Sequence, residues 1–268
     1  MKILILGDVV GDSGRAALKS KLKEIIINHK INFTVVNGEN AANDGKGITN
    51  DIANELFKLG VDVITSGNHI WDKSETIEFI SKEKRLLRPA NLAEGSPGNG
   101  YGIFEVKNLN LKVAVINLMG NVFMRKTEDV FQSAAKIQQA IKLKEKSDFI
   151  IVDFHGEITS EKMAIGHLFD GKATAVVGTH THVPTADTRV MSGGTAYQTD
   201  IGMCGDYNSV IGMDKKNSVL KFLKDKKAIQ HFPAKGEATL SGIIVEADKT
   251  TGLATSVKRF ISGGVLSN

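Results

Sequence analysis

The sequence predicts an α/β fold in one domain, and three features of the chain indicate that class. Up to Ser66, apolar runs of strand length alternate with amphipathic helical stretches in the order β-α-β-α-β. That order at this spacing is typical of parallel strands joined by right-handed crossovers. The last third of the chain carries mostly strand patterns. With 268 residues the chain can bury a sizeable core, so we expect two sheets packed face to face with helices outside, in a single domain over residues 1–268.

The first part of the chain supplies three expected strands and two expected helices. Residues 2–6 form a continuous apolar run, which is typical of a strand covered on both faces. The following apolar positions share one face of an amphipathic helix: Leu18, Leu22, Ile25, Ile26 and His29. Further strands are expected over 31–37 and 61–66, and the helix between them, over 48–59, is ended by Gly60.

The rest of the chain supplies the remaining expected elements. Helical patterns cover 71–84, 127–146, 160–168 and 217–225, with Ser160 as the expected N-cap of the third. An extended piece at 86–91 and a glycine-rich loop over 94–102 come before an expected hairpin of 102–106 with 112–118. Strand patterns then cover 149–154, 173–177, 185–191, 195–199, 240–247 and 254–261.

The composition excludes several classes of protein. The chain has 34 basic and 30 acidic residues, a net charge of +4, and no basic run interleaved with aromatic residues. A nucleic-acid groove is therefore not indicated. The single cysteine, Cys204, excludes an internal disulfide framework and is compatible with a reducing cytosol. The apolar run at 2–6 is too short for a signal peptide, and no later run approaches a membrane span, so we expect a cytoplasmic location without a membrane partner.

Polar residues with metal-binding chemistry follow five of the expected strands. The carboxyl ends of parallel strands lie along one edge of a sheet, where ligands bind. His180 and His182 are two positions apart, so in extended backbone both imidazoles would face one spot just beyond their strand. The residues that the five turns bring to this edge are Asp8, Glu39, Asn40, Asn68, His69, His155, His180 and His182.

This donor set indicates a centre with two metal ions. Two carboxylates, two amide oxygens and three or four imidazoles exceed the four ligands of a mononuclear zinc site. They suit two divalent ions about 3.5–4 Å apart with a bridging carboxylate. Oxygen and nitrogen donors without thiolates fit iron, manganese or zinc. The alternative is a set of turn-forming and hydrogen-bonded polar residues, but burying so much polarity without ions would leave many groups unpaired.

The same residues resemble the motif series of calcineurin-type metallophosphoesterases. The particular residues within each motif are similar to those of the bacterial YmdB-like subfamily. The similarity extends over residues 2–261. The blocks that carry it are Gly7-Asp8-Val9-Val10-Gly11, Asn37-Gly38-Glu39-Asn40-Ala41-Ala42, Gly67-Asn68-His69-Ile70-Trp71-Asp72-Lys73, His155, Gly178-Thr179-His180-Thr181-His182 and Asp200-Ile201-Gly202-Met203. The resemblance implies a four-layer α/β/β/α sandwich with two packed mixed sheets. It also implies a phosphoric diester hydrolase that acts on cyclic nucleotides, above all 2′,3′-cyclic nucleoside monophosphates.

The resemblance further implies a role for each site residue. One metal would be bound by Asp8, Glu39, Asn40 and His182, and the other by Glu39, Asn68, His155 and His180, with Glu39 bridging. A metal-bridging hydroxide would attack phosphorus in line, and His69 would be the general acid that protonates the leaving ribose oxygen. Iron or manganese is expected ahead of zinc, and no organic cofactor is expected. The expected partner is the small cyclic nucleotide, and the oligomeric state stays open, with a homo-oligomer among the options.

The sequence departs from the resembled pattern at three positions. Val10 stands where the broad superfamily has a histidine ligand, and Glu39 replaces its bridging aspartate; the YmdB-like subfamily shares both changes. Asn121 stands where the subfamily pattern has an arginine, and Arg125 is a candidate substitute. If that arginine binds substrate, the substrate preference of this chain would differ.

Some assignments stay open from the sequence. Asp72 either orients His69 or forms a surface ion pair with Lys73. The substrate of the same metal centre could be a phosphomonoester or a phosphoprotein. A third hypothesis is a regulatory module that senses metal or nucleotide and acts through a protein partner, although the intact candidate acid His69 disfavours it.

Overall fold

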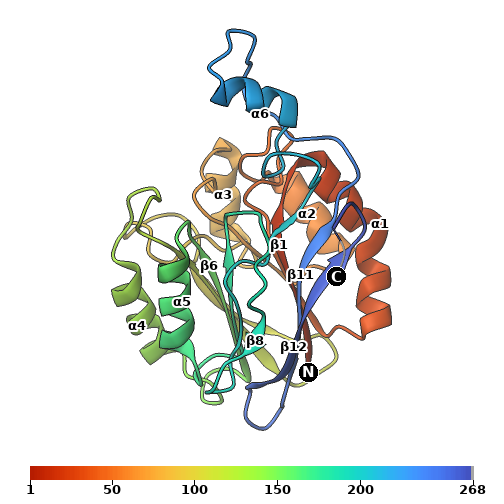
Figure 1. Ribbon diagram of the computed structural model, residues 1–268. Coiled ribbons are helices and arrows are strands. Elements are labelled where there is room, and N and C mark those ends of the chain that lie inside the picture. The colour runs from red at the N-terminus through yellow and green to blue at the C-terminus, as the bar shows by residue number, and fades with distance from the viewer. Residues whose placement is uncertain (267–268) are drawn as a thin grey trace.

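The structure, a computed structural model, describes residues 1–266 and contains two mixed sheets packed face to face (Figure 1). The first sheet has the strand order β12-β11-β1-β2-β3, with β10 beside the end of β1. Its strands are β1 (Lys2–Val9), β2 (Phe33–Asn37), β3 (Val63–Thr65), β10 (Met203–Cys204), β11 (Leu240–Ala247) and β12 (Ala254–Ser262). The second sheet has the order β4-β5-β6-β7-β9-β8. Its strands are β4 (Tyr101–Glu105), β5 (Lys112–Met119), β6 (Phe149–His155), β7 (Ala175–Thr179), β8 (Arg189–Val190) and β9 (Ala196–Gln198).

The strands that end at the candidate site are parallel within each sheet. In the first sheet β1, β2 and β3 are parallel, and in the second sheet β5, β6 and β7 are parallel. The outer strands β4, β8, β11 and β12 run antiparallel to their neighbours, which makes both sheets mixed. The expected class, an α/β fold with two packed mixed sheets, is therefore confirmed.

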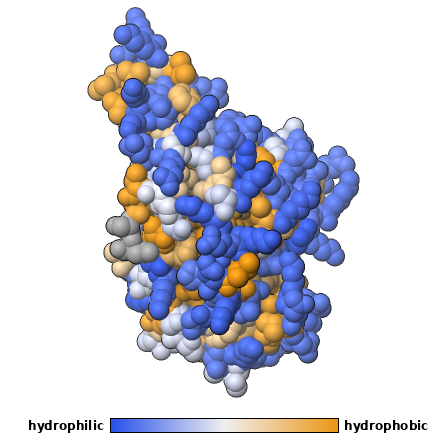
Figure 2. All heavy atoms as spheres, turned by 90° about the vertical axis from the view of Figure 1, so that its right-hand side faces the viewer, coloured by the Kyte–Doolittle hydropathy of each residue, from blue (hydrophilic) through white to orange (hydrophobic). Residues whose placement is uncertain are grey.

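Helices cover the outer face of each sheet and complete the four layers. The first sheet is covered by α1 (Gly11–His29), α2 (Asn50–Leu59) and α3 (Ser74–Lys82). The second sheet is covered by α4 (Val130–Ala140) and α5 (Thr159–Phe169). The sixth helix, α6 (Lys215–Phe222), stands off the body at the end of the molecule where β1 and β6 finish (Figure 1). Figure 2 shows apolar side chains on this projection, and its exposed members include Val219, Phe222, Leu223 and Ile229.

The apolar runs of the strands are continuous because both faces of each sheet are buried. In β1, Ile3 and Ile5 pack between the two sheets, against residues such as Val115 of β5. The alternate residues Leu4 and Leu6 pack outward beneath α1 and α2. Burial on both faces removes the polar alternation of a half-exposed strand. The prediction from residues 2–6 is therefore confirmed, and β1 extends further, to Val9.

Several expected elements differ from the structure. The helix expected over 127–146 ends at Ala140, after which Ile141 is extended and buried. Ser160 is not an N-cap, because α5 begins one residue earlier and Ile158 occupies the cap position. The strand expected over 185–191 shrinks to β8, because Thr185 and Asp187 use their side chains to bond the chain near Thr199 and Asp200. The piece at 86–91 forms only isolated bridges, and the helix expected over 71–84 begins at Ser74.

The two remaining expectations concern the whole chain. Among residues 1–266, no helix combines the length and the apolar character that crossing a bilayer requires. The assignment of residues 1–268 to one domain stays a prediction, and so does the cytoplasmic location.

Candidate metal centre

The predicted ligands come together at the carboxyl ends of the strands of both sheets. Asp8 lies in β1, Glu39 and Asn40 follow β2, and Asn68 follows β3, so the first sheet contributes the oxygen donors. The second sheet contributes the imidazoles: His155 ends β6, and His180 and His182 follow β7. These donors form two clusters, which we call the His155 cluster (Glu39, Asn68, His155 and His180) and the Asp8 cluster (Asp8, Asn40 and His182).

The His155 cluster converges on one ring nitrogen. His155 Nε2 lies 3.0 Å from Glu39 Oε1, 3.1 Å from Asn68 Oδ1 and 3.1 Å from His180 Nδ1. Potential ligand atoms of Glu39, His155 and His180 all lie within 4.8 Å of one another. Such a convergence of carboxylate, amide and imidazole donors is the arrangement that a divalent cation requires.

Hydrogen bonding on the far side of His155 fixes its tautomer. Thr179 Oγ1 donates its proton to Asp153 Oδ1 at 2.7 Å, so it accepts from His155 Nδ1 at 2.9 Å. Asp153 is itself held by Asn37 Nδ2 at 3.0 Å and by the hydroxyl of Thr65. In the neutral ring the lone pair of His155 is therefore on Nε2, facing the oxygens of Glu39 and Asn68. It also faces a lone pair on His180 Nδ1, because His180 Nε2 lies 3.1 Å from Glu157 Oε2 and donates its proton there. Only a proton or a cation can stabilise that arrangement, and the support on Nδ1 is typical of metal-binding histidines.

The pKa values show the same competition between a proton and a cation. Burial opposes charging of His155, but the carboxylates of Glu39 and Asp8 outweigh it and raise its pKa to about 9. Burial would raise the pKa of Glu39, but the adjacent His155 lowers it to about 2. For His180, burial and then the neighbouring His155 lower the pKa to about 3, so its imidazole is neutral. A cation bound in the His155 cluster would replace the proton on His155 and would be bound by the carboxylate of Glu39.

The Asp8 cluster contains a buried carboxylate oxygen that is not satisfied. Asp8 Oδ1 is fully buried and has no hydrogen-bond partner among the described residues. Burial raises the pKa of Asp8 to about 6. His182 Nε2 lies 3.9 Å from this oxygen and 3.2 Å from Asn40 Oδ1, while His182 Nδ1 donates to the carbonyl of Ile211 at 2.8 Å. A lone pair, an amide oxygen and an orphaned carboxylate oxygen thus face one another, and a cation fits this donor set.

The two histidines of the His-Thr-His turn reach the centre differently from the expected way. His180 and His182 are not extended, because their φ angles are 97° and 67°. They therefore do not face one common spot: His180 joins the His155 cluster and His182 joins the Asp8 cluster. The backbone N–H of His180 donates to Asp8 Oδ2 at 3.1 Å, which joins the turn to β1. Left-handed backbone in residues other than glycine is uncommon and concentrates at functional sites.

A buried ion pair supports this turn. Lys162 of α5 and Asp200 are each about 1% exposed, and Lys162 Nζ lies 2.6 Å from Asp200 Oδ2. The same oxygen accepts from the backbone N–H of Thr181 at 3.1 Å and from its hydroxyl at 2.7 Å. Asp200 Oδ1 accepts from the N–H of Gly202 at 2.8 Å. The sequence did not indicate Lys162 or Asp153, nor the role of Thr179 in orienting His155, and the one signal was an aspartate within the apolar run before His155.

His69 lies beside the centre and outside both clusters. Its backbone N–H donates to Glu39 Oε2 at 3.1 Å, and its Nδ1 lies 2.7 Å from Asp72 Oδ2. Arg125 Nη2 donates to the other oxygen of Asp72 at 3.1 Å. Lys73 pairs instead with Asp44 at 2.7 Å. Of the two sequence interpretations of Asp72, the structure therefore has the one in which it orients His69.

A glycine allows the donors of the His155 cluster to approach. Gly67 precedes Asn68 and lies against the imidazole of His155 and the carboxylate of Glu39. A Cβ atom built on Gly67 would overlap His155 Nε2 and Glu39 Oε2. The side chains of His155 and Glu39 thus occupy the space that any side chain at position 67 would need, so only glycine fits there.

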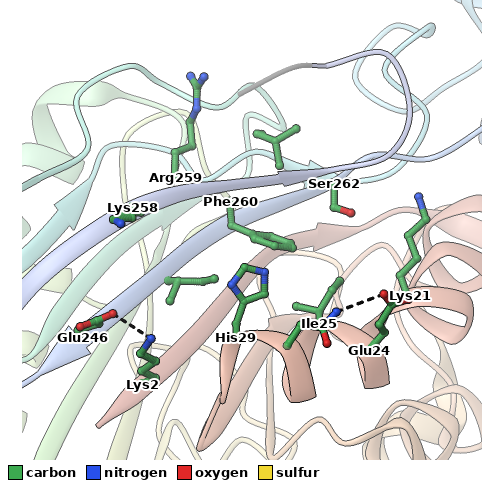
Figure 3. A pocket seen from close by; sticks show the side chains of 13 residues that line it. Lys2, Lys21, Glu24, Ile25, His29, Glu246, Lys258, Arg259, Phe260 and Ser262 are labelled. Carbon is green, nitrogen blue, oxygen red and sulfur yellow. Dashed lines mark hydrogen bonds and ion pairs between the residues drawn. The ribbon is translucent and has the colours of Figure 1, made fainter.

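Another concave surface lies away from these donors. It has a volume of about 610 Å³ and lies between α1 and β12, as Figure 3 shows. Lys2 and Glu246 form an ion pair at 3.1 Å along it, and the ring of His29 packs edge-on against Phe260. The residues that line it include none of the predicted ligands. We therefore assign the candidate site to the two clusters and not to this groove.

The four-layer sandwich, with these donors at one edge of both sheets, is the fold of calcineurin-type metallophosphoesterases. Comparison with known proteins then defines the family. The profile of the YmdB-like protein family matches residues 4–260, and the chain belongs to this family.

Two relatives of known name agree with this assignment, and a more distant solved structure shares only the fold. The chain is 45% identical, over 97% of its own length and 97% of the relative, to the 2′,3′-cyclic-nucleotide 2′-phosphodiesterase of Bacillus subtilis. It is 35% identical to the crystal structure of a novel phosphatase from Mycoplasma pneumoniae, with a TM-score of 0.89 over 98% of this chain and 93% of that one. A 5′-nucleotidase from Candida albicans shares the fold, with a TM-score of 0.56 and 14% identity over 97% of this chain and 50% of that one.

Proposed function

We propose that the protein is a metal-dependent phosphodiesterase that hydrolyses cyclic nucleotides, in particular 2′,3′-cyclic nucleoside monophosphates. The observation that carries the proposal is the pair of donor clusters, in which buried carboxylate, amide and imidazole donors face one another. The name of the Bacillus subtilis relative, at 45% identity over nearly the whole chain, supports the substrate class.

The residues present fit two divalent cations. The Asp8 cluster together with Glu39 would hold one ion and the His155 cluster the other, and iron or manganese are the expected metals. When bound, the ions would neutralise charge on the phosphoryl oxygens and make water acidic enough to attack phosphorus near neutral pH. Asp153 and Thr179 hold the His155 ring in the tautomer that this binding needs.

His69 supplies the proton for the leaving oxygen in this proposal. Its Nδ1 is committed to Asp72, so Nε2 is the atom that carries the proton to the substrate. As the oxygen of water bonds to phosphorus, one P–O bond to the ribose breaks and the ribose oxygen takes the proton from His69. The proton that the water loses is released to solvent, and His69 takes up a proton again before the next turnover. The product is a nucleoside monophosphate in which one hydroxyl of the former cyclic diester is newly free. The backbone N–H of His69 on Glu39 Oε2 keeps the acid next to the metal donors.

Turnover and metal content together test this proposal. Protein loaded with manganese or iron should open 2′,3′-cyclic AMP, and chelation should stop the reaction. His69→Ala should lower turnover by about 10²–10⁴-fold, the usual contribution of a general acid, while elemental analysis still finds about two ions per chain. The matched control is His167→Ala on the exposed side of α5, which should leave turnover unchanged. Full turnover by His69→Ala would remove this residue from the mechanism.

A phosphomonoesterase or protein phosphatase is the second candidate. The related Mycoplasma pneumoniae protein is described as a phosphatase, and this description favours the second candidate. A panel of p-nitrophenyl phosphate, bis-p-nitrophenyl phosphate and cyclic nucleotides separates the two reactions. Preference for the monoester would overturn the phosphodiesterase proposal, whereas tight nucleotide binding without turnover would point to a regulatory module.

A further inference from the structure

The loop of residues 121–126 borders the candidate site on the side of His69. Its first neighbour, Gly120, donates its N–H to the carbonyl of His155 at 3.0 Å. At its other end Arg125 contacts Asp72, which holds the ring of His69. Consecutive Cα atoms are about 3.8 Å apart, so Phe123 lies within about 8 Å of Arg125 and about 11 Å of Gly120, measured between Cα atoms. In Figure 1 this loop is the yellow-green segment above α4, at the end of the sandwich where β6 finishes.

Asn121 and Glu161 fix the conformation of this loop. The side chain of Asn121 donates to Thr127 Oγ1 at 2.9 Å and to the carbonyl of Glu128 at 3.0 Å, and accepts from the N–H of Val130 at 2.9 Å. The carboxylate of Glu161 accepts from the N–H of Asn121 at 3.1 Å. Asn121 is thus occupied within the protein and does not replace a substrate-binding arginine. Arg125 lies on the loop that Asn121 fixes, and its guanidinium contacts Asp72 on the side of the site where His69 lies.

Phe123 is presented to solvent at a structural cost. Its side chain is 85% exposed, and its φ angle of 60° is in the left-handed region, which aromatic residues rarely adopt. Burial does not account for this ring, and the hydrogen bonds of Asn121 and Glu161 hold the loop without it. Strained backbone held by its surroundings concentrates at ligand clamps, and exposed aromatic rings are the platforms on which nucleobases stack.

The proposed reaction places the nucleobase on this side of the site. If His69 protonates the leaving ribose oxygen, the ribose lies next to His69. The base is attached to the same ribose, and Asp72 and Arg125 lie on the rim beside His69, so this part of the rim is within reach of the base. We propose that loop 121–126 is the nucleobase subsite, with Phe123 stacking on the base and thereby favouring cyclic nucleotides over cyclic diesters that lack a base. This inference rests on the proposed function for the position of the ribose.

A comparison of two cyclic diesters tests the subsite. 2′,3′-Cyclic AMP carries a base, whereas glycerol 1,2-cyclic phosphate has the same five-membered diester without one. Phe123→Ala should raise the KM for 2′,3′-cyclic AMP by about 5- to 150-fold, since stacking on an aromatic ring contributes about 1–3 kcal/mol per base. kcat/KM for glycerol 1,2-cyclic phosphate should stay within about twofold. Phe123→Trp should restore the low KM, which a purely structural role of the phenyl ring would not predict.

A matched control and the oligomeric state complete the test. Ile27→Ala removes an exposed apolar side chain at the last turn of α1, the opposite end of the sandwich, and should change neither KM. An unchanged KM for 2′,3′-cyclic AMP in Phe123→Ala would overturn the subsite while the proposed function stands. An equal loss of kcat/KM on both diesters in Phe123→Ala would show that the ring has a structural role, and this result would also overturn the subsite. A change of mass in sedimentation would show that Phe123 is a contact between subunits, and this too would overturn the inference.

Failure of the proposed reaction would be recognised separately. If the metal-loaded wild type opens neither diester, the proposed function fails, and calorimetric binding of 2′-AMP and 3′-AMP then decides on the subsite. Weaker binding by Phe123→Ala than by wild type and Ile27→Ala would support a base-binding loop around a different chemistry. Equal binding by all three proteins would overturn it.

Discussion

Removing the charge of Asp200 should destabilise the protein severely. Asp200→Asn leaves the side chain nearly the same size but takes away the anion that faces Lys162. Both side chains are about 1% exposed, so water cannot replace the lost partner. The N–H and hydroxyl of Thr181 and the N–H of Gly202 also lose their charged acceptor.

The expected loss of stability follows from the burial of both charged groups, Asp200 and Lys162. Breaking a buried ion pair by removing one partner typically costs about 3–5 kcal/mol, because the other charge is left uncompensated. The free energy of unfolding of a domain is about 5–15 kcal/mol, so Asp200→Asn should remove a large part of it. Lys162→Met should cost less, since three hydrogen bonds still stabilise the Asp200 carboxylate. The double variant should be more stable than Asp200→Asn alone, because it contains no orphaned lysine.

Urea unfolding of the four proteins measures these differences. Chelator should be present, so that metal binding does not contribute to stability. The transitions are followed by circular dichroism, and the interaction energy comes from the double-mutant cycle. The prediction is refuted if Asp200→Asn lowers the free energy of unfolding by less than about 1 kcal/mol, or if the double variant is as unstable as Asp200→Asn.

Three further predictions concern the metal donors and the cysteine. Gly67→Ala should fold but lose most of its metal in elemental analysis, because the new methyl group overlaps His155 Nε2 and Glu39 Oε2. Metal affinity should rise by about tenfold per pH unit up to about pH 9, since the raised pKa of His155 means that a cation displaces its proton, and calorimetry in two buffers should detect the proton released. Cys204 is buried and burial raises its pKa to about 12, so iodoacetamide should modify it only after unfolding, as mass spectrometry will show.

Each of these predictions has a result that contradicts it. Full metal content in Gly67→Ala would show that the His155 cluster is not the metal site. Gly95→Ala is the control: it adds a methyl group in open space away from the donors, so its φ of 81° should cost some stability but no metal. Metal affinity that does not change with pH would show that His155 is not a ligand. Rapid alkylation of Cys204 in the native protein would contradict its burial.

The sequence predicted the position of the site residues better than their conformation. The apolar strands ended where expected within a few residues, so the rule that ligands gather at the carboxyl ends of parallel strands placed Asp8, Glu39 and Asn68 together. The rule depends only on strand direction, which the β-α-β order gives. The left-handed backbone of His180 and His182 was not predictable, because it depends on contacts with Asp8 and Asp200 that are distant in sequence.

Elements set by side-chain hydrogen bonds were also predicted poorly. The pattern over 185–191 favours a strand, but Asp187 accepts from the N–H and hydroxyl of Thr199, and these bonds take the place of a longer ladder. Lys162 lies in the expected helix over 160–168, and only the packing of α5 against the second sheet shows that it is buried with Asp200. A single sequence carries no signal for such a pairing across 38 positions.

The division of donors between the two sheets also bears on which metal the protein takes up, and when. Synthesis delivers the oxygen donors of Asp8, Glu39, Asn40 and Asn68 first, and these alone suit hard cations such as magnesium or calcium. The nitrogen donors, which favour transition metals over magnesium and calcium, come only with the imidazoles, the last of which in the chain is His182. A nascent chain should therefore exchange its ions freely until both sheets are complete, which requires β11 and β12, the last strands to be synthesised.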